Sequence, residues 1–162
     1  MELIANGLLG IITGILTTGL LFIAKTLWDT KLKPMLEELR YKGVKVDGKW
    51  GSRNADEEKK TSSEITLFLE QSAYLLTGVC NVRVSSPQNS FDLSYRVQGK
   101  IWEGYVVLSF TPIDRRITSI ATALFKIGGG GVNLVGQYAF RNVNDENVSS
   151  VPLTLTRDSR VA

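Results

Sequence analysis

The sequence predicts a mainly β fold, with a single N-terminal transmembrane α-helix followed by a minimal eight-stranded up-and-down antiparallel β-barrel. Three observations predict it. The stretch from Leu3 to Ala24 holds no charged residue, apolar and polar side chains alternate from Val44 onward, and the alternating runs are joined by short connections. Alternation with a period of two is typical of half-buried antiparallel strands. A closed up-and-down barrel is an economical arrangement for sequential hairpins, because it leaves no free sheet edge.

The uncharged stretch is long enough to cross a bilayer. At about 1.5 Å of rise per residue it forms a helix roughly 33 Å long, against a hydrocarbon core of about 30 Å. A secretory signal peptide has a basic start and an apolar core of about 7–15 residues. Here the run is longer, and the only charged side chain before it is Glu2. We therefore expect a retained single-pass anchor.

Charges around this anchor predict its orientation. Lys25, Lys31 and Lys33 follow the apolar stretch, and no Lys or Arg precedes it. By the positive-inside rule the N-terminus lies outside and the barrel in the cytoplasm, with Trp28 in the interfacial belt. The only cysteine, Cys80, fits a reducing compartment.

Small residues recur along the anchor at Gly10, Gly14 and Thr18. A ridge of small residues four apart lets helices pack closely, so we expect a homo-oligomer formed through this face. The alternative is that these residues are ordinary members of a single span, since such patterns also arise by chance.

The chain divides into four parts by composition. Residues 1–27 form the anchor, 28–43 a helical connector, 44–158 the barrel and 159–162 a tail. Pro34 cannot continue a helix without losing a hydrogen bond, so we expect a kink or a new helix there. The connector is either a stiff spacer or a lever that passes a change in the barrel to the span.

The expected strands follow the alternation of apolar residues. The charged segment from Ser52 to Ser62 is expected as a solvated loop, and Val84 to Ser90 as a turn. Gly128–Gly131 lacks the Gly-Lys-Ser/Thr ending of a phosphate-binding loop, so it is interpreted as a hairpin tip. Glycines in the middle of strands indicate sharp coiling or the close approach of a ligand. The expected strands are 44–50, 64–70, 76–82, 91–101, 105–111, 118–127, 132–142 and 151–157.

Several motifs together resemble a known family. They are Gly48-Lys-Trp50, Leu67-Phe-Leu-Glu-Gln71 leading to Leu76-Thr-Gly78, Tyr95-Arg-Val-Gln-Gly-Lys-Ile-Trp102, Leu134-Val-Gly-Gln-Tyr138 and Val151-Pro-Leu-Thr-Leu-Thr-Arg157. With the preceding anchor, they resemble the transmembrane β-barrel effectors of bacterial CBASS anti-phage systems, which carry a calycin-like barrel. Well-known members have two spans where this chain has one. The resemblance implies a receptor that binds a cyclic di- or oligonucleotide in its barrel, assembles in the bacterial inner membrane and damages it, killing the infected cell.

Aromatic residues on the apolar faces of the strands are the first candidate ligand-binding residues. Trp50, Tyr95 and Tyr138 share parity with the apolar positions of their strands and should point inward. Such rings can stack on nucleobases. The alternative is that they fill the barrel.

Polar candidates complete the predicted site. Arg157 shares parity with Leu153 and Leu155, so it could pair with a phosphodiester or, alternatively, form a capping ion pair at the barrel base. The remaining candidates, on strands whose direction the pattern leaves open, are Ser109, Thr122 and Lys126.

Catalysis and duplex nucleic-acid binding are not expected. The chain has no histidine, no Gly-x-Ser-x-Gly motif and no pattern of metal ligands, so we expect neither an enzyme nor a metal or other cofactor. A net charge of +3 gives no argument for a duplex DNA partner. The expected partners are the cyclic nucleotide, the lipid bilayer and further copies of the chain. Two alternatives stay open, a membrane-tethered scaffolding barrel that docks a protein and a calycin-type binder of hydrophobic ligands.

Overall fold

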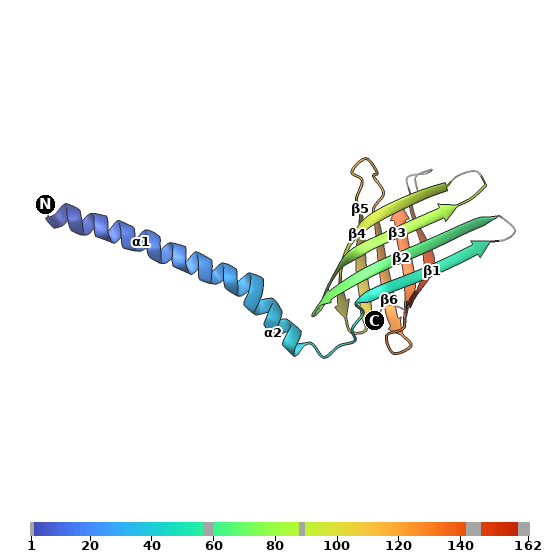
Figure 1. Cartoon of the computed structure of the whole chain (residues 1–162), viewed down its shortest axis with the longest axis horizontal. Coiled ribbons are helices and arrows are strands. Elements are labelled where there is room, and N and C mark those ends of the chain that lie inside the picture. The colour runs from blue at the N-terminus through green and yellow to red at the C-terminus, as the bar shows by residue number, and fades with distance from the viewer. Residues whose placement is uncertain (1, 57–59, 88–89, 142–146, 159–162) are drawn as a thin grey trace. The chain divides into compact units, whose positions relative to one another are not determined.

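The computed structural model describes residues 2–56, 60–87, 90–141 and 147–158, with side chains from Gly10 onward. The chain forms two compact units, Met1–Tyr41 and Lys42–Ala162 (Figure 1). The first is helical and the second is a β-barrel.

The helical unit consists of three consecutive segments, α1 (Glu2–Leu27), a π-helical turn η1 (Trp28–Leu32) and α2 (Lys33–Arg40). The stretch Gly10–Arg40 is long and apolar enough to cross a membrane, judged by length and composition. Pro34 lies in the first turn of α2, directly after the π-helical turn. The backbone stays helical at Leu32 and Lys33, so the change expected at Pro34 takes the form of a π-helical turn within a continuous helical stretch.

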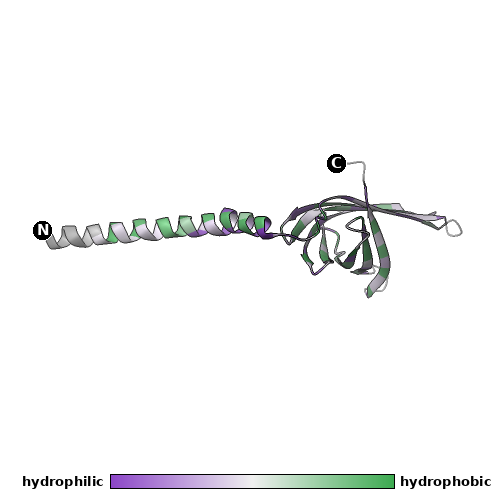
Figure 2. Ribbon diagram, turned by 90° about the horizontal axis from the view of Figure 1, so that it is seen from below, coloured by the Kyte–Doolittle hydropathy of each residue, from purple (hydrophilic) through white to green (hydrophobic). Residues whose placement is uncertain are grey.

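The second unit is a closed antiparallel barrel in which each strand pairs with the next and β8 returns to β1. The predicted eight-stranded up-and-down barrel is thus confirmed. Buried and exposed residues alternate along the strands. Figure 2 shows the corresponding change between hydrophobic and hydrophilic residues along the ribbons of the barrel. The strands are β1 (Gly48–Asp56), β2 (Thr61–Ser72), β3 (Leu75–Ser85), β4 (Ser90–Trp102), β5 (Tyr105–Pro112), β6 (Ala121–Gly128), β7 (Asn133–Arg141) and β8 (Val148–Arg157).

The predicted loop at Ser52–Ser62 is wrong, because β1 continues to Asp56 and β2 begins at Thr61. Pairing across the two strands explains the difference. Arg53 lies opposite Glu64 and forms an ion pair with it, with Nη2 and Oε1 2.5 Å apart. Such cross-strand pairs stabilise a hairpin whose residues are polar on both faces. Residues 57–59 of the predicted loop lie outside the described part of the chain.

Other predicted boundaries shift by a few residues. The first strand begins at Gly48 rather than 44, the sixth at Ala121 rather than 118, and the last at Val148 rather than 151. The turn predicted from 84 to 90 is shorter, since β3 ends at Ser85 and β4 begins at Ser90; residues 88–89 are not described. The hairpin tip predicted at Gly128–Gly131 is confirmed between β6 and β7, where three glycines have positive φ.

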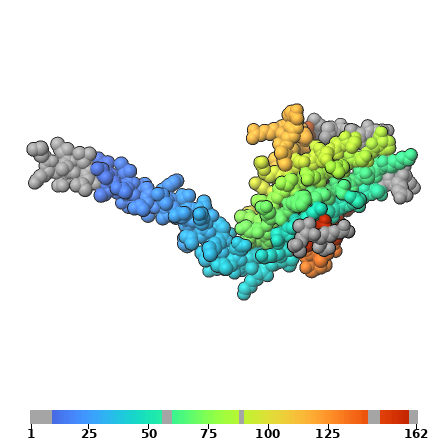
Figure 3. Space-filling model, viewed as in Figure 1, coloured from blue at the N-terminus to red at the C-terminus, as the bar shows by residue number. Residues whose placement is uncertain are grey.

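The two ends of the barrel differ. We call the end with the β2–β3, β4–β5 and β6–β7 turns the base, and the opposite end the mouth. Strands β1 to β4, which Figure 3 shows as one continuous surface, extend further toward the mouth than β5 to β8. The pairing of β4 with β5, for example, stops at Tyr95 opposite Pro112, leaving Ser90–Ser94 of β4 beyond it.

The wall between β1 and β8 is closed only near the base. The two strands pair through Trp50 with Arg157 and Gly51 with Thr156, and no pairing continues toward the mouth along the described residues. Pro152 pairs with Gln137 of β7 and lies in the part of β8 for which no pairing with β1 is present among the described residues. Proline has no N–H to donate to a ladder and is confined to sheet edges, so the incomplete seam matches the sequence of β8.

Glycines in mid-strand serve the coiling of this small barrel. A Cβ atom at Gly78, Gly99 or Gly136 would overlap a backbone carbonyl of the adjacent strand. Only glycine permits this approach between neighbouring strands, so at these three positions the space is taken by the backbone of the next strand.

Candidate functional site

The base half of the barrel is filled by its own side chains. Trp50, from the start of β1, is fully buried there, and no polar or charged residue is buried among the residues that the structure describes. This half is therefore a packed apolar core. The buried residues around Trp50 include Leu67, Leu69, Leu76, Val97, Val106, Leu108, Phe125, Leu134 and Leu155.

The segment that leads into β1 seals the base. Val46 is fully buried. Its N–H donates to Oε1 of Gln71 at 2.7 Å, and its carbonyl accepts a hydrogen bond from Nε1 of Trp50 at 2.8 Å. The last residues before the barrel are thus part of its core, held by side chains of β1 and β2.

Arg157 belongs to the same seal. Its guanidinium lies over the ring of Trp50, 5.2 Å from the centroid, and its Nη2 donates to the carbonyls of Lys45 at 3.0 Å and Asp47 at 2.5 Å. Its Nε is buried and has no hydrogen-bond partner. Arg157 therefore caps the base, through backbone carbonyls rather than through an ion pair, and lies at the opposite end from the mouth.

The mouth half contains a row of four aromatic side chains, each in contact with the next, which we call the aromatic ladder: Tyr95, Phe110, Tyr138 and Phe140. Tyr95 packs edge-to-face on Phe110 with centroids 6.3 Å apart, and Phe110 does the same with Tyr138 at 5.3 Å. Tyr138 and Phe140 are stacked at 5.6 Å with an interplanar angle of 29°. Tyr95 and Phe110 are buried, whereas Tyr138 and Phe140 are only partly buried, so the ladder runs from the core toward the mouth.

Two hydroxyls bring polarity into this otherwise apolar half. The hydroxyl of Tyr95 lies 3.4 Å from Oγ of Ser119, in the connection between β5 and β6. Burial raises the pKa of Tyr138 well above its ordinary value, with smaller contributions from Tyr95 and Cys80. Burial also raises the pKa of the Cys80 thiol to about 12. The Tyr138 hydroxyl and the Cys80 thiol are therefore neutral hydrogen-bonding groups at pH 7.

Apolar side chains complete the inner surface toward the mouth. Ile65, Val82 and Leu93 are partly buried and pack against the core. They come from β2, β3 and β4, across the barrel from the strands that carry Tyr138 and Phe140. The mouth half thus offers aromatic rings on one side and aliphatic side chains on the other.

The predicted site residues divide into three groups. Tyr95 and Tyr138 lie together in the aromatic ladder, and Trp50 and Arg157 lie together at the base. Ser109, Thr122 and Lys126 are exposed on the outer face, where Ser109 lies opposite Thr122. They alternate with the buried Phe110, Ala121, Ala123 and Phe125, so an interior site does not include them.

Phe110 and Phe140 were missed by the sequence reasoning, although a signal was present. Phe110 has the same parity as Leu108 on β5, and Phe140 the same parity as Tyr138 on β7. The seal formed by Val46 and Gln71 had no comparable signal, because it depends on a contact between residues 25 positions apart.

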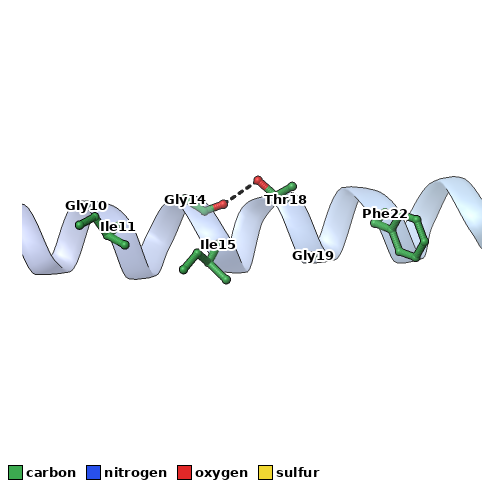
Figure 4. Close-up of a pocket in the computed structure, with 7 residues that line it drawn as sticks. All are labelled: Gly10, Ile11, Gly14, Ile15, Thr18, Gly19 and Phe22. Carbon is green, nitrogen blue, oxygen red and sulfur yellow. Dashed lines mark hydrogen bonds between the residues drawn. The ribbon is translucent and has the colours of Figure 1, made fainter.

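The predicted oligomerisation residues lie along one groove of α1 (Figure 4). A Cβ atom on Gly10, Gly14 or Gly19 would meet nothing within 4 Å, so the missing side chains leave open space. The hydroxyl of Thr18 donates to the carbonyl of Gly14 at 2.8 Å, within the helix. The groove is lined by Gly10, Ile11, Gly14, Ile15, Thr18, Gly19 and Phe22.

These features define a class of protein, a small barrel with a sealed base and an aromatic mouth, joined to an apolar helix that could span a membrane. Comparisons with protein-family models, with curated proteins and with solved structures gave no match for this chain. Within the described residues, no group of three or more His, Cys, Asp or Glu side chains could hold a metal ion.

Proposed function

We propose that this protein is a membrane-anchored receptor whose barrel binds a cyclic di- or oligonucleotide through its mouth. The observation that supports this most directly is the aromatic ladder, which leads from the buried Tyr95 to the partly exposed Tyr138 and Phe140. Stacking of a base on an aromatic ring is worth about 1–3 kcal/mol by alanine substitution. The ladder therefore offers a suitable surface for a ligand that carries flat rings.

The charged part of such a ligand stays at the mouth in this proposal. The base half is packed and apolar, and its one arginine is engaged by Trp50 and backbone carbonyls. The connection from Ile113 to Ile120 carries Ser119, next to Tyr95, and also the exposed Arg115 and Arg116. Bases would contact the ladder while phosphates face these arginines, of which Arg116 also pairs with Asp114.

Binding is then coupled to the membrane helix. Ligand-bound chains self-associate through the groove that contains Gly10, Gly14 and Thr18, and the assembly disrupts the bacterial inner membrane in anti-phage defence. The groove supports self-association because its glycines leave space that a second helix can fill. The proposed orientation, with the N-terminus outside and the barrel in the cytoplasm, rests on the distribution of lysines around α1.

The test is isothermal titration of the detergent-solubilised full chain with a panel of cyclic di- and oligonucleotides. Tyr138→Ala should weaken binding at least tenfold, which is the loss of about 1.4 kcal/mol of stacking. Tyr105→Ala is the matched control, because Tyr105 is exposed on the outside of the barrel. The proposal would be contradicted if the unmodified protein bound no ligand of the panel, or if Tyr138→Ala bound its ligand as tightly as the unmodified protein.

A hydrophobic-ligand receptor is the second candidate, favoured by the apolar interior. The partly buried Ile65, Val82 and Leu93 could contact an acyl chain as well as a base. An assay in which lipids or cyclic nucleotides compete with a fluorescent fatty acid for the full chain distinguishes the hydrophobic-ligand receptor from the nucleotide receptor. Saturable displacement by lipids, together with no response to cyclic nucleotides, would select this candidate.

A further inference from the structure

The outer surface of the barrel base carries aromatic and aliphatic residues that the core does not use. Trp102 is 72% exposed, and Tyr74, Leu75 and Tyr105 are each about half exposed. They occupy the ends of β3, β4 and β5 and the turn before β3. We call these four residues, together with Lys100 and Lys126, the base rim.

The base rim is one continuous patch. Trp102 lies opposite Tyr105 across the β4–β5 hairpin, and Tyr105 lies opposite Lys126 on β6. On the other side, Leu75 lies opposite Lys100, and the carbonyl of Tyr74 accepts a hydrogen bond from the N–H of Ile101 at 2.8 Å. Scattered apolar residues on a surface are ordinary, whereas a contiguous patch marks an interaction site.

We infer that the base rim docks on the headgroup layer of an anionic lipid bilayer. Tryptophan and tyrosine favour the membrane–water interface, where their rings are apolar and their polar edges remain hydrated. Lysine places its ammonium group among lipid phosphates while its methylene stem covers apolar surface. The rim combines both types of residue, and the only acidic side chain in the hairpin turn is Glu103.

Chain connectivity brings this end of the barrel near the bilayer. The anchor is followed by η1 (Trp28–Leu32) and α2 (Lys33–Arg40), and Val46 is already buried in the barrel base. The helical residues of η1 and α2 rise at most about 20 Å, and the six steps from Arg40 to Val46 span at most about 22 Å. The base, where the chain enters the barrel, is therefore the end of the barrel that is tethered to the anchor. The inference needs α1 in a membrane, but it does not need nucleotide binding.

Fluorescence quenching by lipids brominated near the headgroup tests the docking. The full chain is inserted into vesicles that contain phosphatidylglycerol, in a Trp28→Phe background that leaves Trp50 and Trp102. We expect bromolipids to quench the emission of Trp102, and the quenching to disappear in Trp28→Phe/Trp102→Phe, where only the fully buried Trp50 remains. Equal quenching of the two variants would overturn the inference.

Charge reversal supplies a second readout. Lys100→Glu/Lys126→Glu should reduce the bromolipid quenching of Trp102 in anionic vesicles, while Lys60→Glu/Arg115→Glu at the mouth should leave it unchanged. Resistance to alkaline carbonate shows whether the chain is inserted, and titration with cyclic nucleotides on the same vesicles tests the receptor separately. If the chain is inserted but bromolipids do not quench Trp102, membrane docking is refuted. The same holds if a second copy of the chain, rather than lipid, covers Trp102. Neither result contradicts the proposed function.

Discussion

The guanidinium of Arg157 lies over the indole ring of Trp50, 5.2 Å from its centroid, at the point where the last strand of the barrel meets the first. The same guanidinium donates to the carbonyls of Lys45 and Asp47, in the segment that leads from the helical unit into β1. Arg157 therefore performs two tasks. It closes the seam between β1 and β8, and it holds the entering chain against the base.

The first prediction concerns this closure. Arg157→Ala removes two hydrogen bonds and a cation–π contact, and we expect it to lower the free energy of unfolding by about 3 kcal/mol. Arg157→Lys should recover only part of this loss, because an ammonium group cannot reproduce the planar, forked guanidinium. Urea unfolding of the full chain in mild detergent, followed by circular dichroism, measures the change. Arg96→Ala, an exposed arginine on β4, is the control; a loss no larger than that of the control would show that Arg157 does not close the barrel.

Much of the barrel could be predicted because its core imposes a period of two on the sequence. Where a strand has one face in the core, as at Leu67 and Leu69 of β2, the alternation is clear. The hairpin of β1 and β2 loses it beyond Ser52, because both faces there are polar. Its pairing depends on cross-strand contacts such as Arg53 with Glu64, which a scan for apolar alternation does not detect.

The candidate site was predictable in part for the same reason. Parity placed Tyr95 and Tyr138 on inward faces, but it could not tell which end of the barrel each inward residue would occupy. Arg157 shares the inward parity and lies at the base. Its partners, the carbonyls of Lys45 and Asp47, are more than 100 positions away in the chain. No local pattern encodes that contact.

A second prediction concerns the mid-strand glycines. Gly136→Ala should destabilise the barrel by about 3 kcal/mol, since the added methyl group would overlap the carbonyl of Leu124 and force the strands apart. Gly51→Ala is the matched control in β1, where the nearest atom to an added Cβ is the carbonyl oxygen of Ile65 at 3.8 Å. Thermal unfolding of the two variants gives the comparison. Equal melting temperatures would show that close strand approach at Gly136 is not required.

The third prediction is a pH dependence. Burial raises the pKa of the Cys80 thiol from 9.0 to about 12 in the folded protein. Stability from the buried neutral thiol is therefore complete below pH 9 and is lost as the pH rises from 9 toward 12, because the unfolded chain ionises first. Three pKa units correspond to about 4 kcal/mol at most. Tyr138 contributes in the same direction above its ordinary pKa.

The Cys80→Ala variant isolates the thiol. Denaturant unfolding of both proteins between pH 7 and pH 11 should show a steeper loss of stability above pH 9 in the unmodified protein. Parallel curves would show that the thiol is not shielded in the folded state. At pH 8 a thiol reagent should label Cys80 only as fast as the barrel opens, since the thiolate is the nucleophile.

The last prediction concerns the groove of α1. Gly14→Leu fills open space between Gly10 and Thr18, and it should weaken self-association because two helices can no longer approach closely. Leu20→Phe adds bulk to an exposed residue that does not line the groove, so it should leave association unchanged. Energy transfer between labelled full chains in vesicles, with and without the ligand, measures both variants. If Gly14→Leu associates as strongly as Leu20→Phe, the helices meet through another face. If neither associates but ligand binding persists, the barrel senses its ligand without assembly through the span.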